Sequence, residues 1–295
     1  RAVRTGVRSG DTAPETVHDI SAALDEMRLL KDESEIAIMR RAGEVSAAAH
    51  CRAMRATRPD CFEYEIEAEL LHAFRAAGSP SPAYPSIVAR GPNACVLHYT
   101  DNDRRMLDGE LLLIDAGCEL YGYASDITRT FPVNGRFSGP QRDLYQLVLA
   151  ANHAARAKVR PGNGWNTPHE AAVAVLTQGF IDLGLLEGDA QELIKTEAYR
   201  RFYMHRTGHW LGLDVHDAGR YKINGQWRSF VPGMTLTIEP GCYVRPADNV
   251  PEAFWNIGIR VEDNALVTSD GCEILTEGVP RETQAIEELM RDRDG

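Results

Sequence analysis

The chain has 295 residues, of which 43 % are hydrophobic and 25 % are charged, an ordinary balance for a globular protein with a sizeable core. Its formal net charge of -11 at pH 7 argues against a nucleic-acid partner, because nucleic-acid binding usually needs a basic face. No apolar run approaches the ~20 residues that cross a membrane, so no membrane partner is expected.

The opening segment, residues 1–26, has weak hydrophobic periodicity, and we expect it to be a linker or the remnant of a further domain. Residue 1 is Arg and no signal-peptide pattern follows, so we expect the chain to be part of a longer protein. Six cysteines are present and none lies in a CxxC pair, which indicates reduced thiols and a cytoplasmic location.

Two helices are expected next along the chain. The first covers about 33–57 and begins after Asp32 or Ser34, and the second covers about 63–77 and stops at Gly78. The stretch "GSPSPAYPS" that follows is crowded with proline and serine, so we expect it to be irregular.

A second pair of helices is expected in the middle of the chain. Ser138 is a candidate cap for a helix that ends near Pro161. The sequence "TPHE" at 167–170 has the form of a capping box, with Pro168 at the first helical position.

Short apolar runs predict buried strands, and two of them form a faint repeat. "DGELLLIDAGC" (108–118) and "PGMTLTIEPGC" (232–242) share a turn, a hydrophobic strand, an acid and then Gly-Cys. Strand pairs alternate with helix pairs, which predicts an α+β fold with helices gathered on one face of a mostly antiparallel sheet. The repeat suggests two related half-domains that face one another.

Asp115 ends the first of these apolar runs, and a charge at that place is costly unless something neutralises it. Asp126 follows Asp115 by 11 residues, and the midpoint falls at Leu120-Tyr121, beside Gly122. A hairpin turn there would make the two acids cross-strand partners on one face, with Cβ atoms about 4.5–5.5 Å apart. Two carboxylates that close are destabilising unless a cation sits between them.

The second half of the chain repeats this arrangement with Glu239 and Glu262, and "IGIRVED" supplies the returning strand. Four carboxylates and one imidazole form a mostly oxygen ligand set, which suits Mn²⁺ or a similar divalent ion better than a structural zinc. Their combined charge could hold two divalent ions, and two metals about 3.5–4 Å apart form a known hydrolytic device.

The imidazole would come from "HRTGHWLGLDVHD" (205–217), which contains His205, His209 and His216. A helical zinc-protease signature needs a Glu directly after its first His, and here that position is Arg206. Two glycines inside the run also disfavour a helix. The stretch is therefore expected to be a loop, and its residues alone do not select the histidine that binds metal.

Several motifs together resemble the pita-bread metallopeptidases, and among them most closely the Xaa-Pro aminopeptidase (aminopeptidase P) group. These motifs are "LIDAG", "SDITRTFPVNG", "HWLGLDVHD", "TIEPGCY" and "GIRVED". The resemblance covers the chain from about Met27 onward. It implies a pita-bread fold over residues 27–295, in which two pseudo-symmetric half-domains build a curved, mostly antiparallel sheet covered by helices.

The resemblance also implies roles for individual residues. Asp126 and Glu262 would bridge two divalent ions, Asp115 would hold one of them, and His209 with Glu239 would hold the other. The ions are expected to be Mn²⁺, with Co²⁺ and Zn²⁺ as alternatives. The remaining implied site residues face the substrate or support the ligands, with Glu239 acting also as general base, and they are His98, His205, His216 and Arg260; Tyr243 is a further candidate for the pocket wall.

The implied reaction is hydrolysis of the bond between an N-terminal residue and a following proline, so the expected partner is a peptide with proline at its second position. Members of the group usually carry an additional N-terminal domain, and residues 1–26 resemble its end. A homo-oligomer is a further expectation, weakened where that domain is absent.

Other functions remain open at this point. Prolidase shares the fold and acts on Xaa-Pro dipeptides, although "HW" after "RTG" and the short link to "PGMTLTIEP" favour the aminopeptidase. Methionine aminopeptidase fits the long helical N-terminal stretch poorly, and a metal-free creatinase-like enzyme would not need five ligands. A catalytically inactive binding module with this fold would be identified by the loss of a ligand.

Overall fold

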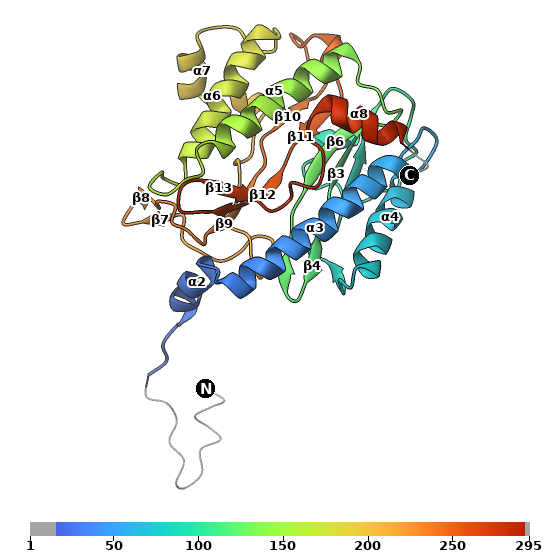
Figure 1. Cartoon of the computed structure of the whole chain (residues 1–295). Helices are drawn as coiled ribbons and strands as arrows, with labels where there is room; N and C mark the ends of the chain where they lie inside the picture. The colour runs from blue at the N-terminus through green and yellow to red at the C-terminus, as the bar shows by residue number, and fades with distance from the viewer. Residues whose placement is uncertain (1–15, 293–295) are drawn as a thin grey trace, which may run out of the picture.

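Two helix pairs frame the fold. In the computed structural model, which describes residues 16–292, α3 (Glu33–Ala56) packs along α4 (Glu63–Ala76), and α5 (Gly139–Arg156) packs along α6 (Thr167–Asp182). The C-terminal helix α8 (Thr283–Arg291) contacts both α3 and α5 and lies between them in Figure 1. Most of the expected opening linker, residues 1–15, falls outside the described part of the chain.

Local capping explains where α3 begins. The Asp32 carboxylate accepts the N–H groups of Ser34 and Glu35, and the Glu35 carboxylate accepts the N–H of Asp32, so these N–H groups at the start of α3 are satisfied. Of the two expected caps, the structure therefore selects Asp32. The α4 helix ends at Ala76, and Gly78 follows with a φ of 94°.

Two details that the sequence analysis expected for the helices are wrong. Helix α5 stops at Arg156 rather than near Pro161, because the N–H of Val159 already turns back to the carbonyl of Arg156. Asn166 occupies the N-cap position of α6 without a side-chain capping hydrogen bond, so Thr167 is inside the helix and no capping box forms at 167–170. A short helix that was not expected, α2 (Ser21–Leu29), crosses the boundary set at residue 26.

The first half-domain is built on antiparallel strands. Strand β3 (Leu111–Asp115) lies between β2 (Ile87–Arg90) and β6 (Thr128–Pro132). Beside them, a three-stranded sheet has the order β1-β4-β5, with bounds Ser81–Pro82, Cys118–Leu120 and Tyr123–Ala124. The run expected to be irregular therefore includes one two-residue strand.

The second half-domain repeats the pattern. Strand β12 (Asp263–Val267) lies between β9 (Thr235–Ile238) and β13 (Cys272–Ile274), and β10 (Gly241–Val244) pairs with β11 (Ile257–Arg260). The two repeated sequence runs fall on β3 and β9, and every strand pair in the described residues is antiparallel. The expected α+β architecture with two related halves is confirmed.

The halves join along β6 and β11, where the N–H of Glu262 donates to the carbonyl of Thr128 and the N–H of Arg260 donates to the hydroxyl of Thr130. Helices α3 and α5 pack over the strands and bury a continuous apolar core (Figure 1). No helix of the described residues is long and apolar enough to span a membrane. The remaining elements are α7 (Ala190–Lys195), β7 (Lys222–Ile223), β8 (Gln226–Trp227) and the 3-10 turns Gly91–Cys95, Ala198–Arg201 and Glu252–Phe254.

Candidate metal centre

The ends of β3 and β6 bring the first two acids together. Asp115 pairs with Thr128, not with Asp126, because the hairpin turns at Tyr121 and Gly122, which both have positive φ. The expected register was wrong by one position at the turn. Asp126 therefore lies diagonally across from Asp115, and the Tyr84 hydroxyl contacts both carboxylates, with 2.7 Å to Asp115.

The second acid pair stands where the register predicted it. Asp263 pairs with Ile238 on one side and Arg260 pairs with Gly241 on the other, which leaves Glu239 directly opposite Glu262 in the gap between these two ladders. Glu262 accepts a hydrogen bond of 2.6 Å from the hydroxyl of Thr128. Thr128 is the first residue of β6, so this hydrogen bond joins the second acid pair to the strand that comes after Asp126.

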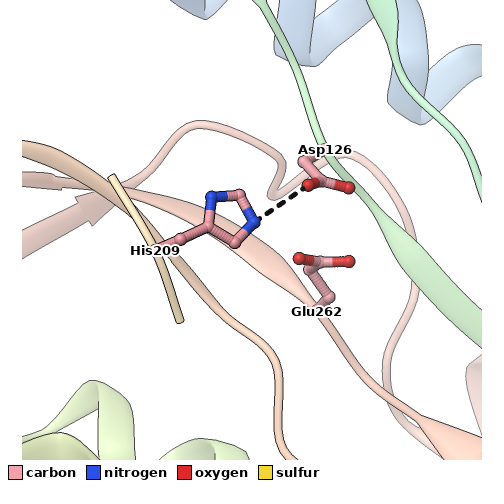
Figure 2. Close-up of side chains that lie close together, drawn as sticks. All are labelled: Asp126, His209 and Glu262. Carbon is pink, nitrogen blue, oxygen red and sulfur yellow. Dashed lines mark ion pairs between the residues drawn. The ribbon is translucent and has the colours of Figure 1, made fainter. Parts of the chain in front are cut away.

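The imidazole of His209 faces the carboxylates of Asp126 and Glu262 (Figure 2). Its Nδ1 is 2.9 Å from the carbonyl of Trp210, so Nδ1 carries a proton, and Nε2 is the nitrogen that faces the carboxylates and can bind a metal ion. Nε2 lies 3.4 Å from Asp126 and 3.6 Å from Glu239. One ligand atom from each of Asp126, His209 and Glu262 lies within 4.8 Å of the other two, as a shared ion would require.

Burial and mutual repulsion make it costly to ionise all the carboxylates of this cluster. Burial, reinforced by the neighbouring carboxylates, raises the pKa of Glu262 well above its usual range. Burial also raises the pKa of Glu239 to about 7. Burial alone would lower the pKa of His209, but Asp126 and Glu239 beside it raise that pKa to about 9. These buried carboxylates cannot all ionise without a compensating charge, and the donor set suits a hard divalent ion.

A buried cation of the protein, Arg260, reaches one edge of the cluster. Arg260 donates to Asp115 over 2.5 Å and to the hydroxyl of Tyr243 over 2.8 Å. Although burial raises the pKa of the Asp115 carboxyl, the charge of Arg260 holds it below its usual value. Arg260 thus contacts Asp115 directly.

Tyr243 links this arginine to His205. The Nε2 atom of His205 is 2.8 Å from the Tyr243 hydroxyl, and its Nδ1 is 2.8 Å from the carbonyl of Arg206. Nδ1 therefore carries the proton, and burial lowers the pKa of His205 to about 3. Both nitrogens are already paired, so this imidazole is neutral and fixed in the wall.

The cluster lines a cavity of about 570 Å³. His98 and His216 are exposed side chains on its wall, and the ring of His216 lies edge-on to that of His209, with 4.3 Å between centroids. The structure brings nearly all the sequence-derived site residues to this one cavity: Asp115, Asp126, His209, Glu239, Glu262, His98, His205, His216 and Arg260. Tyr243 does not line the cavity, but its hydroxyl contacts two residues that do, His205 and Arg260.

Sequence reasoning missed four aromatic residues of the cavity wall, Tyr84, Trp165, Tyr221 and Trp227. Tyr84 lies in the run that was set aside as irregular, and only its position between two prolines could have drawn attention to it. The ring of Trp165 packs against that of Tyr221, with 4.6 Å between centroids. Trp165 and Tyr221 together add aromatic surface to the cavity wall.

Comparisons with known proteins agree with this geometry. The sequence profile of metallopeptidase family M24 matches residues 37–269. The chain is 53 % identical to a Xaa-Pro aminopeptidase of Haemophilus influenzae, over 90 % of this chain and 62 % of that protein. It is 49 % identical to the Xaa-Pro aminopeptidase of Escherichia coli, over 98 % of this chain and 65 % of that protein.

Solved structures resemble the fold over almost its whole length. An aminopeptidase PepP structure from Pseudomonas aeruginosa superposes with a TM-score of 0.96 at 53 % identity, covering 99 % of this chain and 66 % of that one. The chain therefore spans just under two thirds of the length of these relatives.

Proposed function

Because the chain belongs to metallopeptidase family M24, we propose that it is the catalytic part of a Xaa-Pro aminopeptidase, which hydrolyses the bond between an N-terminal residue and a following proline. The named activity of its relatives supports this substrate class. A proline imide nitrogen has no N–H and its ring fixes φ, so the bond needs a site of its own.

The observation that carries the proposal is the convergence of buried carboxylates on one imidazole at the wall of an open cavity. Asp115 ends β3, Asp126 lies between β5 and β6, Glu239 follows β9, and Glu262 precedes β12. His209 meets them from a loop. A structural role would not need so many like charges in one place, since each one destabilises the folded state without a cation.

In the proposed active form the five ligands would hold two divalent ions. Asp126 and Glu262 would be shared by both ions, Asp115 would bind one, and His209 with Glu239 would bind the other. When bound, the ions supply Lewis-acid polarisation of the substrate carbonyl and a water of lowered pKa. Glu239 is the proposed general base, and Arg260 holds Asp115 in the orientation that ligation needs.

The exposed histidines act on the substrate side of the cavity. His216 lies beside the ligand His209 and would donate a hydrogen bond to the oxyanion and move a proton. His98 would meet the substrate near its N-terminus. For His205, the paired nitrogens support a narrower role than proton transfer, in which it holds the Tyr243 hydroxyl in place.

We propose Mn²⁺ as the resident ion, since the ligand set is mostly carboxylate. Zn²⁺ and Co²⁺ remain alternatives, and one solved E. coli relative is a zinc-substituted form. The proposed catalytic unit is residues 27–295. All six cysteines are free, which supports the proposed cytoplasmic location.

A peptide-cleavage assay tests the proposal. The purified chain, with Mn²⁺, is offered a Xaa-Pro-Xaa tripeptide, a Xaa-Ala-Xaa tripeptide and a Xaa-Pro dipeptide. The proposal predicts release of the first residue from the Xaa-Pro-Xaa tripeptide alone or far above the others. Preference for the dipeptide would identify a prolidase, and cleavage of none with metal bound would identify a binding module.

A further inference from the structure

The loop that carries the cavity histidines closes on itself. His209 and His216 stand near its two ends, and the backbone N–H of Asp217 donates to the carbonyl of Trp210 over 3.0 Å. The loop has no helix or strand of its own between residues 211 and 217. Its shape must therefore be set by contacts with the rest of the protein.

A buried ion pair supplies such a contact. The side chain of Asp217 is 0 % exposed and accepts a hydrogen bond of 3.0 Å from Lys31, whose own side chain is 1 % exposed. Arg28 donates to the other oxygen of Asp217 and, over 2.7 Å, to Asp214. Both cations come from the segment around the end of α2, far from the loop in sequence.

The cationic side of the pair is itself anchored. The backbone N–H of Lys31 donates to the carbonyl of Gly233 over 2.9 Å, just before β9. The loop, the α2–α3 connection and the start of β9 thus meet at one point. Neither Lys31 nor Asp217 lines the cavity, so a direct role in substrate or metal binding does not explain them.

Gly212 accounts for the close fit at this point. A Cβ atom on residue 212 would lie 2.1 Å from the Asp217 carboxylate and 2.8 Å from the Lys31 ammonium. Because Gly212 has no Cβ atom, the Lys31–Asp217 ion pair can occupy this space. The motif "HWLGLDVHD" therefore contains, besides its two histidines, a glycine and an aspartate that serve one buried contact.

We propose that Lys31 and Asp217 are positioning residues whose ion pair, completed by Arg28, fixes the loop so that His216 stands beside His209. A buried ion pair contributes little net stability compared with apolar residues of the same size, so its value here is a single loop arrangement. The proposal rests on the role of His216 given under the proposed function, and it adds the residues that hold His216 there.

A double-mutant cycle between Asp217 and His216 tests the proposal. Asp217→Asn is expected to lower kcat by about 10²-fold, the scale of a misplaced active-site group, while bound metal and KM are unchanged. In the His216→Ala background the same substitution is expected to have no further effect on kcat. Losses that multiply in the double variant would overturn the proposal.

The matched control is Ile286→Ala, which opens a cavity under α8, where Ile286 is 0 % exposed, and does not touch the loop. A kcat loss in Asp217→Asn no larger than in this control would mean a merely structural role. Should Asp217→Asn fold poorly, the double variant Lys31→Met with Asp217→Asn removes both partners, so neither charge is left buried without the other. The same cycle with His216→Ala is then run on it.

Amide hydrogen exchange supplies a readout that needs no catalysis. Residues 210–217 are expected to exchange faster in Asp217→Asn than in wild type, and unchanged in Ile286→Ala. Equal protection of that loop in all three proteins would overturn the proposal. If wild type cleaves no peptide, the proposed function fails, and the exchange result still decides whether the ion pair holds the loop.

Discussion

Replacement of Arg260 by glutamine should expose how strongly the acid cluster depends on a compensating charge. Its guanidinium donates to Asp115 over 2.5 Å, and the two side chains are only 5 % and 14 % exposed. Loss of one partner of a buried pair leaves the other charge unpaired and costs about 3–5 kcal/mol. By contrast, the Arg40–Glu273 pair has side chains 43 % and 37 % exposed, so Arg40→Gln should cost about 0–1 kcal/mol.

Urea unfolding of the chelated protein at several pH values measures both effects. Arg260 keeps the pKa of Asp115 below its usual value, so this carboxylate stabilises the fold near neutral pH, and the benefit is lost as pH falls through that pKa. Without the arginine, burial raises the pKa of Asp115. The gap between wild type and Arg260→Gln should therefore be widest near neutral pH and narrow in acid. A gap equal to that of Arg40→Gln, or one independent of pH, would refute this reasoning.

Two further predictions concern the metal centre. His209→Ala should lose bound metal, whereas His216→Ala and His98→Ala should keep metal and lose about 10²–10⁴-fold in kcat, as metal analysis beside kinetics would reveal; metal loss in His216→Ala would mean that the wrong imidazole is assigned. Chelation with EDTA should abolish peptide cleavage and added Mn²⁺ should restore it, so activity that persists in a verified metal-free sample would exclude the proposed chemistry.

The sequence was most informative where one physical rule governs many residues. Apolar runs ended by an acid identified β3 and β9 and the carboxylates Asp115 and Glu239, because a charge at a buried strand end needs a reason. The pairing of Glu239 with Glu262 followed from the repeat of the first acid pair and from the returning strand "IGIRVED", and it is confirmed by the ladders on either side. The choice of His209 among three histidines needed the family resemblance.

Other features depend on contacts that no local pattern records. The register of Asp115 depended on which residues of the hairpin adopt positive φ, and Tyr121 does so beside Gly122. Tyr84 reaches the acids from a segment without periodicity. The Lys31–Asp217 pair joins residues 186 positions apart, and each of them alone resembles an ordinary surface charge.

Metal stoichiometry tests the central claim most directly. Wild type and Asp126→Asn are loaded with Mn²⁺, freed of excess ion and analysed for metal per chain beside tripeptide cleavage. The account predicts two ions per chain in wild type, and at most one with activity lost in Asp126→Asn, because a neutral amide bridges two cations poorly. Two ions and full activity in Asp126→Asn, or no bound ion in wild type, would contradict it.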